Sequence, residues 1–156
     1  SYNMLKNEAF SSGYYNGFVK KSVTINASKK KIWKKISDVI TLDWVQGLKK
    51  SICISEKKQG VGTVRKLIFQ DGSIIKEHIV GWKNEQYFSY IAVSGLPLRG
   101  YHATISLVAC SKKSITVTWK SYFNSEEMTK KQFAEFCSFI ELFYRNSLNA
   151  LKTSLE

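Results

Sequence analysis

The sequence predicts an α+β fold in which a curved antiparallel sheet of seven strands wraps around one long C-terminal helix, with two short helices after the first strand. Residues 126–156 contain neither Gly nor Pro and place their apolar residues at helical spacing. Most of the preceding chain consists of short strand-like runs separated by turn residues. A helix rich in aromatic side chains needs a large concave partner surface, and a bent sheet supplies one.

The C-terminal helix carries an apolar arc along about half of its circumference. Asn124 followed by Glu127 resembles a capping box and predicts the start of the helix. Leu142 is the apolar residue that falls on the polar side. The arc consists of Phe133, Phe136, Cys137, Ile140, Phe143, Tyr144, Leu148, Leu151 and Leu155. The aromatic and aliphatic side chains that we expect to be largely buried are Trp33, Trp119, Phe136, Ile140 and Tyr144.

The N-terminal part of the chain divides at residue 20. Residues 1–19 are rich in Ser, Asn, Gly and Tyr, and they are predicted to form an irregular or loosely docked extension. Residues 20–156 are predicted to form a single domain, because the chain is too short for two ordinary ones. Alternation of apolar and polar residues over residues 19–25 indicates the first strand.

Two short helices are expected after this strand. Ser28 resembles a helix N-cap, and the apolar stripe of Ile32, Trp33 and Ile36 predicts the first helix. A second brief helical turn is expected over residues 42–45, before Gly47.

The middle of the chain is predicted to be a meander of six strands. Asp71-Gly72 is a strong signal for a two-residue hairpin. The other links are also short, and short links join antiparallel neighbours. The predicted strands cover residues 49–56, 63–70, 73–82, 87–93, 101–109 and 114–123.

The net charge of +12 raises the question of an anionic partner. Among the 24 basic residues only Arg65, Arg99 and Arg145 are arginine. The planar guanidinium of arginine donates paired hydrogen bonds to phosphates and base edges, which lysine does less well. The lysines form doublets scattered along the chain, which is typical of a solvated surface. We therefore expect no specific nucleic-acid partner, while weak contact with an anionic membrane stays an alternative.

Several sites and compartments are not expected from the sequence. No apolar run reaches the roughly 18 residues that a membrane span requires, and the N-terminus has no signal-peptide pattern. Cys53, Cys110 and Cys137 cannot pair completely and have no metal-ligand spacing, so they are interpreted as buried thiols of a cytoplasmic protein. We expect no metal and no cofactor.

Residues 20–156 resemble the helix-grip superfamily, which includes START lipid-transfer domains, Bet v 1-like plant proteins and bacterial polyketide cyclase-like proteins; the last branch is the most similar. The order and spacing of several short motifs carry the resemblance. They are Ile32-Trp33 with Ile36-Ser37-Asp38 and Trp44, Gly60-Val61-Gly62-Thr63-Val64-Arg65, Asp71-Gly72 with Glu77, Ser89-Tyr90, Leu96-Pro97 with Tyr101-His102-Ala103-Thr104, and Val117-Thr118-Trp119 with Phe123. The resemblance implies an apolar tunnel between sheet and helix that holds a hydrophobic ligand such as a lipid, polyketide or isoprenoid.

Strand periodicity proposes a lining for this tunnel, because every second residue of a strand faces the helix. Inward aromatic residues alternate with small ones such as Ala92, Ala103 and Ser121, which leave room for a ligand. Filling of an ordinary core is the alternative. The predicted ligand-binding residues are Trp44, Arg65, Leu67, Glu77, Ile79, Phe88, Tyr90, Tyr101, Ala103, Ile105, Trp119, Phe136, Ile140, Phe143 and Tyr144.

Glu77 is the foremost polar candidate, since it shares a strand face with apolar residues. A desolvated carboxyl group there could act as an acid or base, together with Tyr90 or Tyr101, or anchor a ligand. An ion pair with Arg65 is the structural alternative. His78 and His102 are predicted to point outward.

Three functions follow from these observations together with what the resemblance implies. The first is binding of a small hydrophobic ligand, for transport or sensing, without strong catalysis. The second is a cyclase, aromatase or dehydratase in which Glu77 and a pocket tyrosine exchange protons. The third is a lipid carrier that docks on anionic membranes.

Overall fold

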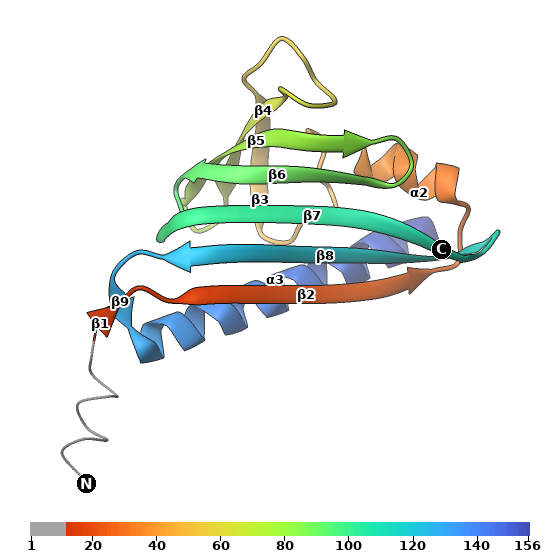
Figure 1. Cartoon of the computed structure of the whole chain (residues 1–156). Helices are drawn as coiled ribbons and strands as arrows, with labels where there is room; N and C mark the ends of the chain where they lie inside the picture. The colour runs from red at the N-terminus through yellow and green to blue at the C-terminus, as the bar shows by residue number, and fades with distance from the viewer. Residues whose placement is uncertain (1–11) are drawn as a thin grey trace, which may run out of the picture.

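The computed structural model describes residues 12–156 and shows one curved sheet packed against a long helix (Figure 1). The seven strands of this sheet lie in the order β2-β8-β7-β6-β5-β4-β3, and every neighbouring pair is antiparallel. A separate two-stranded sheet pairs β1 with β9. The elements are β1 Ser12–Gly13, β2 Asn16–Ile25, α2 Lys29–Ile36, β3 Leu48–Cys53, β4 Val64–Phe69, β5 Ile74–Lys83, β6 Tyr87–Ser94, β7 Leu98–Ser111, β8 Ser114–Ser125, β9 Met128–Thr129 and α3 Lys130–Leu155. The predicted fold class and its seven-stranded sheet are confirmed.

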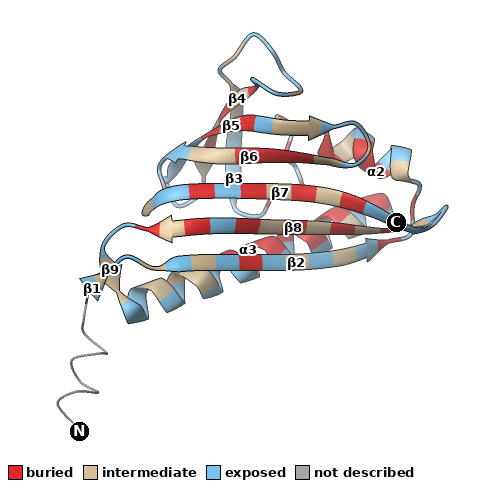
Figure 2. Ribbon diagram, viewed as in Figure 1, coloured by how far each residue is buried: buried red, intermediate tan, exposed pale blue. Residues whose placement is uncertain are grey.

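The alternation read from the sequence sets which side of each central strand is buried. On β8, Val117, Trp119, Ser121 and Phe123 are buried, whereas the residues between them are exposed or half-buried. Figure 2 shows this alternation as red bands along β7 and β8. Because side chains alternate between the two faces of a strand, the buried set faces α3.

Helix α3 starts later than predicted. Thr129 is its N-cap and forms a capping box with Gln132. Asn124 cannot be the cap because it belongs to β8 and pairs with Asn16 of β2. Pairing of Asn124 in the sheet therefore overrides the local capping signal, and the helix begins after Thr129.

The burial of α3 changes along its length. Tyr144, Leu148 and Leu151 are fully buried, and Ile140 is buried as expected. Phe136 is only half-buried, so its predicted burial is partly wrong, and Phe139 is 62% exposed. The reason is that this first half of the helix passes over a cavity rather than a packed core.

The segment between the first helix and β3 is only partly as predicted. Ser28 caps α2 by accepting a hydrogen bond from the backbone N–H of Lys31, which confirms the first helix. Residues 42–47 form turns instead of a second helix. The carboxylate of Asp38 accepts hydrogen bonds from the backbone N–H groups of Ile40 and Thr41, and such local bonds favour turns over helix.

Two further expectations need correction. Strand β2 begins at Asn16, so the predicted boundary at residue 20 falls inside a strand; residues 1–11 lie outside the described residues. The three cysteines are free, but none is fully buried, since Cys53 and Cys137 are half-buried and Cys110 is exposed. No helix in residues 12–156 is long and apolar enough to cross a membrane.

Candidate functional site

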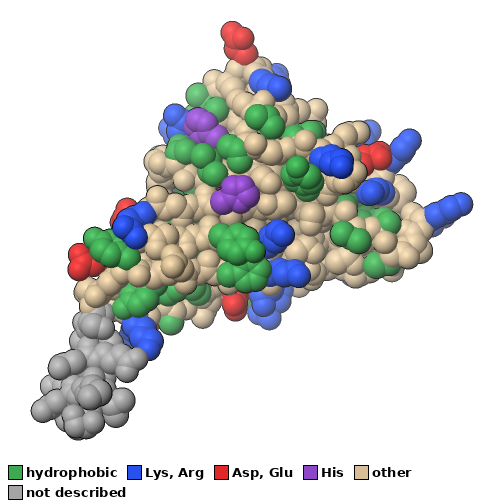
Figure 3. Space-filling model, viewed as in Figure 1, with side chains coloured by type: hydrophobic (Ala, Val, Ile, Leu, Met, Phe, Trp, Pro, Cys, Tyr) green, Lys and Arg blue, Asp and Glu red, His purple; other side chains and the backbone are tan. Residues whose placement is uncertain are grey.

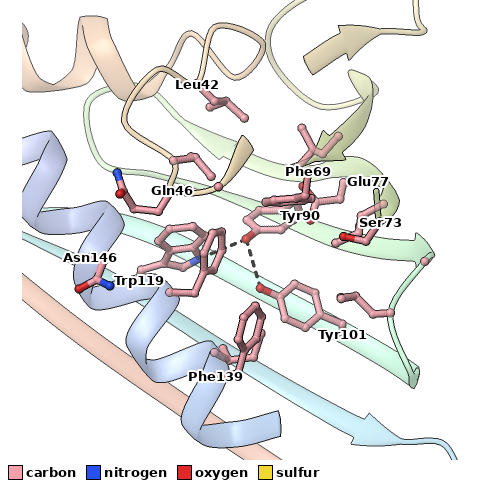
Figure 4. Close-up of a pocket in the computed structure, with 18 of the residues that line it drawn as sticks. Leu42, Gln46, Phe69, Ser73, Glu77, Tyr90, Tyr101, Trp119, Phe139 and Asn146 are labelled. Atoms are coloured by element: carbon pink, nitrogen blue, oxygen red, sulfur yellow. Dashed lines mark hydrogen bonds between the residues drawn. The ribbon is translucent and has the colours of Figure 1, made fainter. Parts of the chain in front are cut away.

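A cavity of about 570 Å³ lies between the inner face of the sheet and residues 136–146 of α3. Its walls come from β4 to β8 and α3, and its rim comes from the turns over residues 42–47, 70–73 and 95–97. Figure 4 shows side chains from these separate elements converging on one space. The meander brings together residues that lie far apart in the sequence, because each hairpin turns the chain back across the same concave face.

Most of the residues proposed from strand and helix periodicity line this cavity. Glu77 and Arg65 do so as the buried polar pair, and Tyr90 and Tyr101 do so as hydroxyl-bearing rings. The predicted residues that line it are Trp44, Arg65, Leu67, Glu77, Phe88, Tyr90, Tyr101, Ile105, Trp119, Phe136, Ile140 and Phe143. Ile79, Ala103 and Tyr144 do not line it and are buried in the core instead.

Sequence reasoning missed the rim and part of one wall. Phe69 and Ile75 follow the same alternation as Leu67 and Glu77, so extending that pattern would have found them. Leu142 was placed on the polar side of the helix, yet it lines the cavity mouth. The other missed lining residues are Leu42, Val45, Gln46, Gly47, Gln70, Asp71, Ser73, Gly95, Leu96, Pro97, Phe139 and Asn146.

The loop over residues 95–97, before β7, forms part of the cavity rim, and its position depends on Gly95. Gly95 has a φ of +99°, a conformation that favours glycine. A Cβ atom at this position would lie 2.0 Å from the carbonyl oxygen of Ile74. The close backbone approach holds the loop against β5, and Leu96 and Pro97 then reach the cavity rim.

A buried ion pair joins neighbouring strands β4 and β5 in the cavity wall. Arg65 donates to Oε1 of Glu77 from Nε at 3.0 Å and approaches the same oxygen with Nη2 at 2.9 Å. Its Nη1 donates to the carbonyl oxygen of Val39 at 2.8 Å, and its guanidinium lies 4.9 Å from the centre of the Tyr90 ring. Burial raises the pKa of Glu77, and the charge of Arg65 opposes this rise.

A chain of hydroxyl groups runs from the cavity wall into the core. The indole Nε1–H of Trp119 donates to the hydroxyl oxygen of Tyr90 at 3.0 Å. The hydroxyl groups of Tyr90 and Tyr101 lie 3.2 Å apart, and that of Tyr101 also bonds that of Tyr144. Figure 4 marks the first two contacts with dashed lines.

The hydroxyl chain has one hydrogen more than its internal bonds use. The three phenols carry three O–H hydrogens, and the two bonds between them consume two. Tyr90 accepts the hydrogen bond from the indole of Trp119, so this bond uses none of the three phenol hydrogens. Burial raises the pKa values of Tyr90, Tyr101 and Tyr144, so the phenols stay protonated at neutral pH. Either oxygen of each bond can be the donor; when Tyr90 and Tyr144 both donate to Tyr101, the hydroxyl hydrogen of Tyr101, which lines the cavity, is free to donate to an oxygen in the cavity.

Aromatic rings make up much of the remaining wall. The rings of Trp119 and Tyr144 stack with centroids 4.1 Å apart and planes 14° apart. Trp44 and Phe143 each contact Trp119 at centroid distances of 5.8 and 5.6 Å. These mutual contacts fix the rings in position, and together they present flat apolar surface to the cavity.

No metal site accompanies the cavity. Within residues 12–156 no group of three or more His, Cys, Asp or Glu side chains is placed to hold a metal ion. Among the described residues that line the cavity, Asp71 is a carboxylate at the rim and Glu77 a buried one, which pairs with Arg65. The chemistry available to the cavity comes from neutral hydroxyl donors, aromatic faces and a paired charge.

Solved structures confirm the fold. The protein XoxI from Bacillus cereus is 22% identical with a TM-score of 0.77, covering 89% of this chain and 95% of its own. An aromatase/cyclase from a Streptomyces species is 14% identical with a TM-score of 0.78, covering 90% and 94%. Norcoclaurine synthase from Thalictrum flavum, solved with dopamine and hydroxybenzaldehyde, is 19% identical with a TM-score of 0.69, covering 90% and 86%.

No protein of curated function matches the sequence significantly. A family model described as polyketide cyclase / dehydrase and lipid transport matches residues 18–156, nearly the whole described chain. The match agrees with the helix-grip architecture and with the resemblance seen in the sequence motifs. By this match, the chain belongs to the polyketide cyclase / dehydrase and lipid transport family, as a helix-grip domain of the ligand-binding and cyclase type.

Proposed function

We propose that the protein binds a small, uncharged, ring-containing molecule that carries a hydrogen-bond acceptor oxygen, in the cavity between the sheet and α3. The observation that carries the proposal is a cavity of about 570 Å³ walled by aromatic rings and reached by the phenol chain. Cavities of this size and character suit molecules of the size of common cofactors and metabolites.

The polarity of the wall favours an uncharged ligand. The interior cation of the cavity, Arg65, already has both Glu77 and a backbone carbonyl as partners. A carboxylate ligand would have to compete with Glu77 and would leave that group buried and unpaired, which is costly. The phenols, in contrast, offer a neutral donor that suits a ketone, ester or phenol oxygen.

The aromatase/cyclase and norcoclaurine synthase with the same fold support ring-containing ligands, since both names denote chemistry on such molecules. Fold similarity alone does not carry function. The main support for a ring-containing ligand is therefore the aromatic cavity wall of this chain.

A suitable experiment compares three naphthalene probes by titration into the 15N-labelled protein, followed by NMR. The probes are 2-acetonaphthone, the hydrocarbon 2-ethylnaphthalene and the anion 2-naphthoate. We expect saturable binding of the ketone and the hydrocarbon, tighter for the ketone by the value of a neutral hydrogen bond, about 0.5–1.5 kcal/mol. The anion should bind most weakly.

Two matched variants test whether binding takes place in the cavity. Asn146 and Asn149 are both exposed on α3, but only Asn146 lines the cavity. Asn146→Trp should weaken probe binding because the indole obstructs the mouth, whereas Asn149→Trp should leave it unchanged. Failure of the native protein to bind either neutral probe, or equal behaviour of the two variants, would overturn the proposal.

A second candidate function is a cyclase or dehydratase in which Glu77 transfers a proton. The observation that favours it is a carboxyl group of raised pKa in the cavity wall. Glu77→Gln should then lower turnover by about 10²–10⁴ while probe binding survives. Unchanged turnover in this variant would exclude the role.

A lipid-carrier function is the third candidate. It is favoured by Phe139 and Leu142, which are 62% and 47% exposed at the cavity mouth. Sedimentation with anionic vesicles across a salt series tests it, and absence of binding even at low salt would remove it.

A further inference from the structure

The outer face of the sheet, turned away from α3, carries a row of side chains that crosses five neighbouring strands. Direct cross-strand partners run from Phe18 to Tyr122, His102, Ile91 and His78, on β2, β8, β7, β6 and β5. Four of these five side chains are rings. With strands about 4.8 Å apart, the row is roughly 19 Å long.

The rings at one end of the row are open to solvent. Phe18 is 51% exposed and Tyr122 is 57% exposed, and their centroids lie 4.7 Å apart. His102 is exposed beside them. Figure 3 looks onto this face and shows both histidines of the chain on it, next to hydrophobic side chains and flanked by Lys and Arg. These rings take no part in the core or in the cavity.

Lysine pairs lie on both sides of the row. Lys20 and Lys120 are direct cross-strand partners next to Phe18 and Tyr122. Lys66 and Lys76 form a second pair at the other end. Strands β8 and β5 run in opposite directions, so the two pairs lie on opposite sides of the row. Like charges placed directly opposite each other destabilise a sheet, and a bound anion would relieve this repulsion.

The five strands that form the row carry no acidic side chain on this face. Among the residues of β2, β5, β6, β7 and β8, Glu77 is the one acidic residue, and it points into the cavity. With the net charge of +12, this face attracts polyanions. Strand pairing brings together four lysines on this face that lie far apart in the sequence, Lys20 with Lys120 and Lys66 with Lys76.

We propose that the outer face binds a single-stranded nucleic acid segment, with bases stacked on Phe18 and Tyr122 and phosphates held by the flanking lysine pairs. Exposed rings on a sheet accept unstacked bases, since every base has an aromatic face. A duplex keeps its bases stacked, and no helix within residues 12–156 projects from this face to enter a groove. A second copy of the chain would bring equal positive charges together.

The binding is expected to be independent of sequence. Lys contacts phosphates as a point charge, whereas the bidentate base contacts that specify sequence come mainly from Arg, Asn and Gln. This inference does not depend on the cavity or its ligand.

Fluorescence anisotropy with a labelled thymidine dodecamer tests the proposal. We expect saturable binding in 50 mM salt that weakens as salt rises, with a log–log slope of about 0.7 per phosphate contacted. Phe18→Ala and Tyr122→Ala should each weaken binding at least about five-fold, the smallest loss expected for one stacked base. Tyr122→Phe keeps the ring and should retain binding. The same sequence as a duplex should bind more weakly than the single strand.

Phe139→Ala is the matched control, because Phe139 is an equally exposed ring on the opposite side of the sheet. It should leave oligonucleotide binding unchanged and alter only binding to the cavity. No binding at 50 mM salt would overturn the proposal. Binding with equal affinity in all four variants would replace stacking with plain charge attraction. Loss of anionic-vesicle binding in Phe18→Ala, without oligonucleotide binding by the native protein, would replace it with a membrane contact.

Discussion

Arg65→Met is the most informative change to the cavity wall. The substitution removes the guanidinium that pairs with Glu77 and keeps much of the apolar stem. Both side chains are nearly inaccessible, with 4% and 7% of their side-chain surface exposed. Solvent therefore cannot replace the lost partner, and the carboxylate is left buried and unpaired.

The expected loss of stability follows from this burial. Removing one partner of a buried ion pair costs about 3–5 kcal/mol. For a chain of this size 1 kcal/mol shifts Tm by about 2–4 °C, so Tm should fall by about 6–20 °C at neutral pH. Globular domains have about 5–15 kcal/mol in total, so this loss takes a large share of the stability of the fold.

The loss should depend on pH. Burial raises the pKa of Glu77 above its ordinary value of 4.5, and Arg65 opposes that rise, so the variant should have a still higher folded-state pKa. A carboxyl group with a raised folded-state pKa stabilises the fold fully below its unfolded pKa, and this stabilisation is lost as pH rises through the folded pKa. The deficit relative to the native protein should be small near pH 5 and large near pH 8.

Thermal denaturation followed by circular dichroism at these two pH values measures both effects. Arg145→Met, at an exposed position on α3, is the control for loss of a positive charge. Arg65→Met combined with Glu77→Gln should regain stability at pH 8 and lose the pH dependence. An equal deficit at both pH values, or no deficit, would refute the reasoning.

Three further predictions concern single contacts. Gly95→Ala should destabilise the protein much more than Gly72→Ala, because both have positive φ but only Gly95 would place a Cβ against the backbone of Ile74; urea denaturation giving equal losses would contradict this. Thr129→Ala should cost about 0.5–2 kcal/mol through loss of the α3 cap, and unchanged urea stability would show that sheet contacts alone place the helix start. Tyr101→Phe should weaken binding of 2-acetonaphthone about two- to ten-fold and leave 2-ethylnaphthalene unchanged; equal losses for both probes would show a change of cavity shape instead of a lost hydrogen bond.

Much of the cavity wall could be predicted because it depends on local periodicity. The inward side of β8 and of β7 follows from strict alternation, and it correctly places Trp119, Tyr101 and Ile105 at the cavity. Alternation could not, however, distinguish residues that line the cavity from residues packed in the core, because both lie on the inward face of a strand. Ala103 shares the strand face of Tyr101 but is buried between neighbouring strands, and Tyr144 is covered by the stacked ring of Trp119.

The pairing of Arg65 with Glu77 was an alternative at the level of sequence, and the structure shows the ion pair. The strand register decides it, since the two residues are direct partners across β4 and β5. The phenol chain has no sequence signal of its own, because Tyr90, Tyr101 and Tyr144 come from three separate elements.

The sequence by itself determined the types of element, their order and the apolar side of the long helix, because side-chain spacing within one segment controls these properties. Only the tertiary structure decided where α3 begins and which rings reach one another. It also gathered Lys20 with Lys120 and Phe18 with Tyr122 on the outer face. These properties depend on pairing between separate elements of the fold, and local patterns carry no information about the register of such pairing.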